Sequence, residues 1–363
     1  MWQERVRRIQ NLMEERNLDL LFVVGRENLI YFVGTTQIEC MALLIPKAGE
    51  PQAIVLWLDA AHVREKGMEV VPYYFPQETL VDKAVDCLKK AGYKAPRIGF
   101  EKYFVEFSVY EGLRKGFPAA EFINATELFY RVRSIKDEDE IEKIRKASQI
   151  LCSGMEAAIK TIRPGISELE VLAEAEYTML KAGSSGLPFR PQIVSGEKTL
   201  MSHPHSSNKV IQEGEVVVVH IGATYEGYCS KMCRTVALGD IPPEQERTYE
   251  LLLQAQEAAI GKLRDGVTSE QVDAAAREVI AKAGFEKAFL TYIGYGVGLR
   301  QSEFYPIIGK GRKEVIQKKM VVDLLLPTIY KKGIGGPRIT DTILVKDDGA
   351  EILTNYPREL IRI

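Results

Sequence analysis

The sequence has few cysteines and no excess of positive charge. Its five cysteines are scattered through 363 residues without a CxxC pair, which argues against a disulfide framework and against a structural zinc site. Its 48 lysines and arginines are offset by 50 acidic residues, so the net charge is −2. Because a dedicated nucleic-acid binder needs a basic surplus to neutralise phosphates, we expect no nucleic-acid partner.

Long hydrophobic runs are also absent. The most apolar stretches are short and typical of strands, well below the length that spans a membrane. The N-terminal segment, residues 1–8, is charged and is not followed by the apolar region of a signal peptide. Together with the scattered cysteines, these absences predict a cytoplasmic protein without membrane contact.

The first third of the chain alternates short apolar runs with segments of helical periodicity. The runs that we expect to form strands are residues 18–24, 41–45, 52–57 and 97–100. Helical spacing is found in residues 4–17, 59–66, 78–92 and 106–116. This alternation predicts an α/β domain. An acid-rich helix start at 136–140 then indicates a second domain, so we expect domains of 1–133 and 134–363.

The second domain contains an internal repeat, because residues 162–183 align with residues 263–284 without a gap. In each copy an N-cap Ser or Thr is followed three residues later by Glu or Gln, which is a capping box, and a glycine stands where the helix should end. These residues are Ser167, Glu170 and Gly183 in the first copy and Thr268, Gln271 and Gly284 in the second. A long helical pattern precedes each copy, at 137–161 and 243–263.

Strand-forming sequence follows each copy. Residues 215–222 and 228–236 have the pattern of a hairpin, and residues 320–326 and 340–345 are further strand candidates. The simplest interpretation is a duplicated helix-helix-strand unit that forms one pseudo-symmetric α+β domain. A cavity between the two halves is then the favoured place for a ligand.

Several of these segments resemble the creatinase / prolidase / aminopeptidase P family. The segments that carry the resemblance are Asn28–Gly34, Gly214–Thr235, Gly294–Leu299 and Leu353–Pro357. The resemblance covers essentially the whole chain. It implies a creatinase-like N-terminal α/β domain, an α+β "pita-bread" C-terminal domain and a homodimer.

In the peptidases of this family, two Asp, one His and two Glu hold two divalent ions that activate water. The resemblance places these five ligands at His220, Lys231, Tyr295, Leu326 and Thr340. A cluster of hard dications needs carboxylate oxygens, whereas Lys231 is a cation and Leu326 has no lone pair. We therefore expect no metal site and no cofactor.

His203 is the candidate catalytic residue. It aligns with the family histidine that contacts substrate outside the metal shell, and in creatinase, which also lacks the metals, that histidine is the proposed general base. Three of the four histidines, His203, His205 and His220, fall in this part of the sequence. The alternative is that His205 is a solvated loop residue and that His220 is a hydrogen-bonded core residue.

The candidate ligand-binding residues are His205, His220, Lys231, Tyr295, Glu303 and Arg338. Lys231 could anchor a carboxylate, or form a structural ion pair with Glu303 or Asp341. Arg338 matches a family arginine near the last ligand, and it either binds a substrate carboxylate or supports the sheet. Tyr295 either fills the volume of the lost metals or donates to a ligand. Cys233 should share a face with Lys231, either paired with His203 for catalysis or simply buried.

These features leave three functional hypotheses open. The first is a metal-free pseudoenzyme whose neutral-to-cationic pocket binds a peptide or a small anionic ligand. The second is a creatinase-like, metal-independent hydrolase or lyase that acts on a C–N bond with His203 as the base. The third is a residual Xaa-Pro peptidase, which requires metal and is opposed by the five substitutions.

Overall fold

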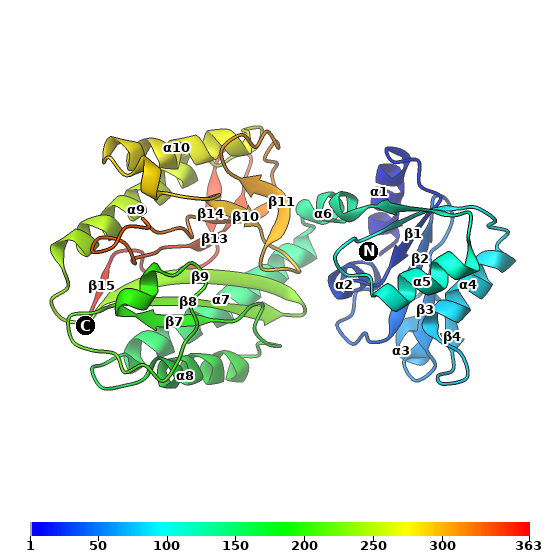
Figure 1. The fold of residues 1–363 in the computed structure, drawn as a ribbon, viewed down its shortest axis with the longest axis horizontal. Coiled ribbons are helices and arrows are strands. Elements are labelled where there is room, and N and C mark those ends of the chain that lie inside the picture. Colours follow the sequence, from blue (N-terminus) through cyan, green and yellow to red (C-terminus); the bar gives the residue numbers. More distant parts are fainter. Residues whose placement is uncertain (1) are drawn as a thin grey trace. The chain divides into compact units, whose positions relative to one another are not determined.

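The chain divides into two units, one ending at Arg133 and the other beginning at Ser134, in a computed structural model that describes residues 2–363 (Figure 1). Each unit has its own sheets and its own hydrophobic core. In the described residues, no helix is both long enough and apolar enough to cross a membrane.

The N-terminal unit is an α/β fold around a six-stranded mixed sheet of order β4-β3-β2-β1-β5-β6. The strands are β1 Leu20–Val23, β2 Met41–Pro46, β3 Gln52–Leu56, β4 Glu69–Tyr73, β5 Arg97–Phe100 and β6 Glu121–Asn124. The helices are α1 Trp2–Glu14, α2 Arg26–Val33, α3 Ala60–Arg64, α4 Leu80–Lys90, α5 Phe107–Gly116 and α6 Thr126–Ser134. Every residue of β1 is buried, as expected for a central strand that is covered on both faces.

Four long helices form the outer layers of the C-terminal unit. They are α7 Glu138–Thr161, α8 Glu168–Lys181, α9 Pro243–Lys262 and α10 Ser269–Lys282. Both predicted capping boxes are present, at the starts of α8 and α10. Gly183 (φ 99°) and Gly284 (φ 82°) follow the ends of these helices in the left-handed conformation that favours glycine.

Two antiparallel-rich sheets lie between the helix pairs. The four-stranded sheet, of order β15-β9-β8-β7, contains β7 Gln192–Ser195, β8 Val216–Tyr225, β9 Tyr228–Ala237 and β15 Ile361–Arg362. The five-stranded sheet, of order β11-β10-β12-β13-β14, contains β10 Gly294–Gly296, β11 Glu303–Ile308, β12 Val321–Leu324, β13 Asp341–Val345 and β14 Ala350–Ile352. Cys233 and Thr340 join the sheets through reciprocal backbone hydrogen bonds of 3.0 and 3.2 Å.

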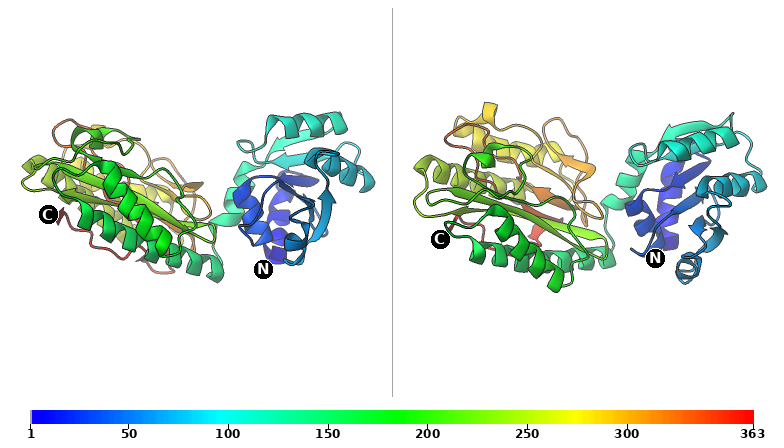
Figure 2. Two further views of the ribbon diagram at one scale, coloured as in Figure 1. Left: turned by 90° about the horizontal axis from the view of Figure 1, so that it is seen from below. Right: turned by 60° about the horizontal axis from the view of Figure 1, so that its bottom comes forward.

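Each helix pair covers one sheet, as both figures show (Figures 1 and 2). The pair α7/α8 packs on the four-stranded sheet and the pair α9/α10 packs on the five-stranded sheet. Along β8, Val217, Val219 and Ile221 face α7 and α8, whereas Val216 and Val218 belong to a cluster on the opposite face. Because side chains alternate along a strand, His220 lies on this second, inner face.

Candidate functional site

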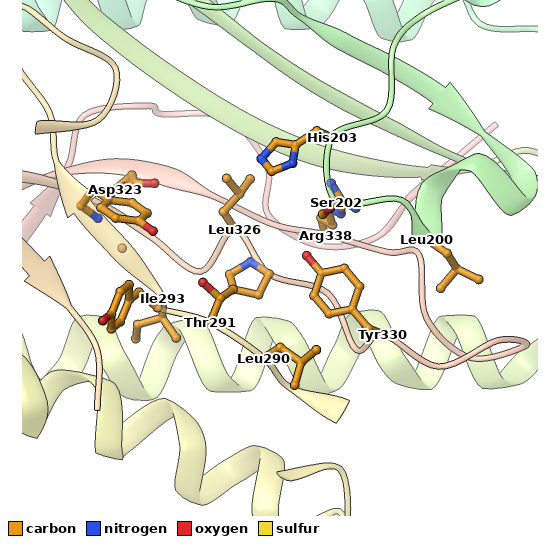
Figure 3. Close-up of a pocket in the computed structure, with 14 residues that line it drawn as sticks. Leu200, Ser202, His203, Leu290, Thr291, Ile293, Asp323, Leu326, Tyr330 and Arg338 are labelled. Carbon is orange, nitrogen blue, oxygen red and sulfur yellow. Dashed lines mark hydrogen bonds between the residues drawn. The ribbon is translucent and has the colours of Figure 1, made fainter. Parts of the chain in front are cut away.

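A pocket of about 500 Å³ lies in the C-terminal unit (Figure 3). Its lining residues come from the segments that follow each copy of the repeat. The segment after the first copy contributes Leu200, Ser202 and His203. The segment after the second copy contributes Leu290–Tyr295, Asp323, Leu326, Pro327, Tyr330 and Arg338. The pocket therefore lies at the junction of the two halves, and its volume is in the range of small-molecule sites.

The structure brings only part of the predicted site together in this pocket. His203, Tyr295 and Arg338 line it, together with Leu326. His205 is exposed on the loop beyond His203 and does not line the pocket. The remaining predicted residues, His220, Lys231 and Glu303, are buried and are not among the lining residues.

Arg338 is the cation of the pocket wall. Its side chain is 2% exposed, and Nη2 donates to the carbonyls of Thr199, at 2.9 Å, and Met201. Its backbone exchanges two hydrogen bonds of 2.8 Å with the Thr235 hydroxyl. Its Nε has no hydrogen-bond partner, and no acid of the described chain forms an ion pair with the guanidinium. Arg338 is therefore a rigidly held, buried positive charge that protein groups leave uncompensated.

Lys231, at one of the positions where the resemblance expects a metal ligand, is a buried ammonium. Its side chain is 1% exposed, and Nζ lies 2.9 Å from Oδ2 of Asp323, whose side chain is fully buried. This is an ion pair without the geometry of a hydrogen bond. Nζ also donates to Gln301 Oε1 at 3.1 Å and Ser302 Oγ at 3.2 Å. The other Asp323 oxygen accepts from the amide of Tyr295 at 2.6 Å.

The acidic partner that we predicted for Lys231 is wrong, because the partner is Asp323 and not Glu303 or Asp341. Asp341 is paired with Arg234, whose Nη2 lies 2.6 Å from its Oδ1. A signal for Asp323 was present in the sequence, since it is the only charged residue in the apolar run 320–326. A carboxylate in a buried strand requires a partner, and that requirement could have identified it.

His220 is buried but not hydrogen-bonded, so the interpretation as a hydrogen-bonded core histidine is wrong. The residue is 4% exposed and stands opposite Cys233 in the β8–β9 ladder. Its ring packs on Phe189 at a centroid distance of 4.6 Å, and neither ring nitrogen has a hydrogen-bond partner among the described residues. Burial, and then the charges of Lys231 and Arg338, hold the pKa of His220 well below its ordinary value. The imidazole is therefore neutral.

Cys233 and Tyr295 are both held in their protonated forms. Complete burial raises the pKa of the Cys233 thiol to about 12, which leaves no thiolate for a catalytic pair with His203. Burial, followed by the charge of Asp323, raises the pKa of Tyr295. The Tyr295 ring makes edge contacts with Tyr292 at 6.4 Å and Phe304 at 5.7 Å. The aromatic ring thus packs beside the pocket and keeps a hydroxyl proton to donate.

The residues at the five positions where the resemblance expects metal ligands do not fit a pair of divalent ions. His220, Lys231, Tyr295, Leu326 and Thr340 include no carboxylate, and hard dications require oxygen ligands. The described residues contain no cluster of three or more His, Cys, Asp or Glu that could hold a metal. Asp323, the only acid among the pocket's lining residues, already neutralises Lys231.

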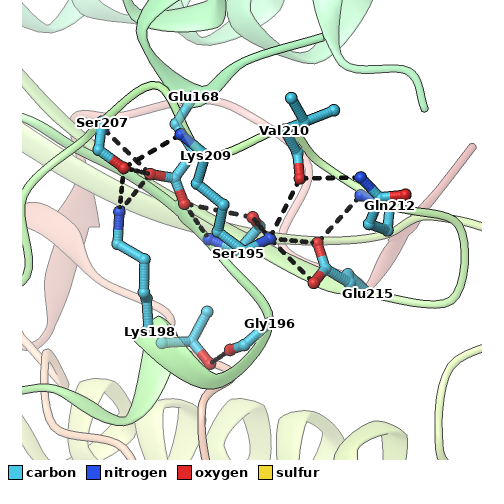
Figure 4. A network of polar contacts seen from close by, with 10 residues as sticks. Glu168, Ser195, Gly196, Lys198, Ser207, Lys209, Val210, Gln212 and Glu215 are labelled. Atoms are coloured by element: carbon cyan, nitrogen blue, oxygen red, sulfur yellow. Dashed lines mark hydrogen bonds and ion pairs between the residues drawn. The ribbon is translucent and has the colours of Figure 1, made fainter. Parts of the chain in front are cut away.

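A polar network holds the segment that carries His203 (Figure 4). Glu168, at the first turn of α8, is completely buried and accepts from the amides of Ser195 at 2.9 Å and Ser207 at 3.1 Å. Lys198 forms an ion pair with the same carboxylate and donates to the Ser207 hydroxyl at 2.8 Å. The segment 196–207 is thus fixed at both ends, which positions His203 at the pocket wall.

Sequence reasoning missed several lining residues. Beside Asp323, these are the aromatic and apolar residues Leu290, Tyr292 and Tyr330. Leu290 and Tyr292 are 53% and 39% exposed, in a segment without helical or strand periodicity. Nothing in the sequence pattern distinguishes such loop residues from other surface residues.

Comparison with known proteins agrees with this architecture. Residues 142–347 match Metallopeptidase family M24, and residues 5–135 match the Creatinase/Prolidase N-terminal domain. The chain is 33% identical to a putative dipeptidase, YkvY, of Bacillus subtilis, with 98% of this chain and 99% of the relative covered. It is 32% identical to an Xaa-Pro dipeptidase of Pyrococcus furiosus, with 99% of both chains covered.

Solved structures have the same fold. An Xaa-Pro dipeptidase from Bacillus anthracis superposes with a TM-score of 0.93 at 30% identity, over the full length of both chains. The N-terminal domain of the FACT complex subunit SPT16 from chickpea superposes with a TM-score of 0.82 at 19% identity, over 99% of this chain and 98% of that domain, which shows the fold alone. The protein therefore belongs to metallopeptidase family M24, with a creatinase/prolidase N-terminal domain followed by the pita-bread fold.

Proposed function

We propose that this M24-family protein binds a peptide or a small anionic ligand in its C-terminal pocket and lacks metallopeptidase activity. The observation that carries the proposal is the buried Lys231–Asp323 ion pair. The ammonium stands at a position where the family resemblance expects a metal-binding aspartate, and an ammonium repels a divalent ion. The pair fills that position with a charge-neutral unit that needs no metal.

Arg338 is the reason for proposing that the ligand carries a negative charge. It is a buried cation at the pocket wall, it has no ion-pair partner among the described acids, and its Nε lacks an acceptor. A ligand carboxylate in the pocket would supply the missing negative charge. Charge-assisted hydrogen bonds to guanidinium groups are among the strongest in proteins.

We expect Arg338→Gln to weaken the binding of 3-phenylpropionate by about ten- to a hundredfold, the range for loss of a charge-assisted hydrogen bond. Glutamine is two bonds shorter than arginine and does not reach the Thr199 carbonyl that Nη2 contacts, so the folding of this variant is checked separately. Arg338→Lys, which retains the charge, should keep more affinity than the glutamine variant. Isothermal titration calorimetry measures each affinity.

The uncharged 3-phenylpropanamide is the ligand control, because it differs only in the charged group. It should bind more weakly than the acid to the unmodified protein. Equal affinities for acid and amide, in a folded protein, would contradict an anion site irrespective of how the Arg338 variants behave.

His203 supports a second candidate, the creatinase-like hydrolase or lyase. It lines the same pocket, is exposed, and is of the residue type that most often acts as a general base. Turnover of a C–N substrate that survives chelators and disappears in His203→Asn would favour this candidate over a binding protein. The roles of His205, His220, Tyr295 and Glu303 in ligand binding, the homodimer and the cytoplasmic location stay predictions.

A further inference from the structure

The charges around the pocket restrict what can stand beside a bound carboxylate. Among the lining residues of the described chain, Asp323 is the only acid, and both of its oxygens are engaged, by Lys231 and by the Tyr295 amide. The charge at the pocket wall that no group of the described chain compensates is the positive charge of Arg338. A cationic group of a ligand would therefore find no free carboxylate in this pocket.

Two energetic costs would oppose the binding of a ligand with a free α-ammonium group. It loses its hydration on entering the pocket without gaining an ion pair, and it lies close to the carboxylate and hence to Arg338. The tyrosine rings of the pocket attract cations, but that attraction is weaker than the cost of removing an ammonium from water. The same pocket offers neutral hydroxyl groups at Ser202 and Tyr330, which suit an amide.

We infer that the pocket takes an N-acylated amino acid, a carboxylate whose α-nitrogen carries no charge, and discriminates against the free amino acid. This inference rests on the proposed function, since it requires Arg338 to hold the carboxylate. Apolar and aromatic lining residues, including Leu290, Leu326 and Tyr292, would surround the side chain of the ligand. The selection against the free amino acid arises because the described residues of the pocket offer no carboxylate that is free to pair with an ammonium group.

Four compounds test the inference: N-acetyl-L-phenylalanine, L-phenylalanine, and the carboxamide of each. They vary the ammonium and the carboxylate independently on one carbon skeleton. We expect N-acetyl-L-phenylalanine to bind at least about tenfold more tightly than L-phenylalanine, a difference of about 1.4 kcal/mol, and more tightly than either amide. Titration calorimetry on the full chain gives the four affinities.

The outcomes separate the two proposals. If the two carboxylates bind equally and both exceed their amides, the anion site stands and the selection against ammonium is overturned. If the carboxylates do not exceed their amides, or if none of the four compounds binds, the anion site itself is overturned and the inference with it.

A variant of the pocket supplies the missing acid. Leu326 lines the pocket and is partly exposed, so Leu326→Glu would place a carboxylate where an ammonium could reach it. This variant should reduce the preference for N-acetyl-L-phenylalanine over L-phenylalanine by about tenfold. Leu326→Gln is the matched control of the same size without charge, and it should keep the preference. An unchanged preference in a folded Leu326→Glu protein would contradict the inference.

Discussion

Asp323→Asn is expected to lower the free energy of unfolding by about 3–5 kcal/mol, the cost of breaking a buried ion pair by removing one partner. Lys231 would then be a buried cation whose remaining contacts are the neutral Gln301 and Ser302. Asparagine keeps an oxygen that can accept from the Tyr295 amide, so the change removes the charge and little else. Urea unfolding at pH 7 measures the effect.

The double variant Lys231→Met/Asp323→Asn is the internal control. It removes both charges, and neutral replacements of a buried pair are often tolerated, so it should recover most of the stability that Asp323→Asn loses. Glu156→Gln is the surface control, because its pair with Lys160 is largely exposed and should contribute little. A loss that is equally small in Asp323→Asn and Glu156→Gln would contradict the buried pair.

His220→Phe is expected to make the protein less sensitive to acid. Folding holds the pKa of His220 well below the ordinary value of 6.5, so this group contributes stability above that pH and loses it as the pH falls. Below pH 6.5 the unfolded chain binds one more proton at this position, which costs up to about 1.4 kcal/mol per pH unit. Phenylalanine removes the proton site, breaks no hydrogen bond of the ring and can still pack on Phe189.

Unfolding free energies at pH 7, 6.5, 6 and 5 give the slope of stability against pH. We expect a shallower fall for His220→Phe than for the unmodified protein, and the same for His220→Leu if phenylalanine overfills the site. His205→Gln is the matched control, because His205 is exposed in the folded chain and should leave the slope unchanged. Parallel curves for the unmodified protein and both His220 variants would show that His220 is not held neutral.

The fold could be predicted well from the sequence because its signals are local. The capping boxes at Ser167 and Thr268 and the glycines that end α8 and α10 depend on residues within one helix, and each is present. The periodicity of the sequence did not reveal several short elements, among them α2, β4 and β6, which have eight, five and four residues. Segments of this length hold too few residues to establish a period.

The partners within the site could not be predicted, because they depend on which strands meet. The domain of Lys231 contains many acids, and only the strand pairings β8–β9 and β12–β13 place Asp323, rather than Glu303 or Asp341, beside its ammonium. The pocket likewise combines loop residues with Arg338, which is more than 30 residues beyond most of them. The sequence was sufficient to single out Arg338 as a candidate. That its Nε has no acceptor and that no acid of the described chain pairs with it depend on how the chain packs.

Metal content is the measurement that tests the central claim most directly. The full-length protein is dialysed against excess manganese, cobalt or zinc and then against metal-free buffer, and the metal per chain is determined by mass spectrometry. The account predicts no stoichiometric metal and no chelator-sensitive hydrolysis of Xaa-Pro dipeptides, because Lys231 with its partner Asp323 fills the site. One or two tightly held ions per chain would contradict it and would return the protein to the metal-dependent peptidases of its family.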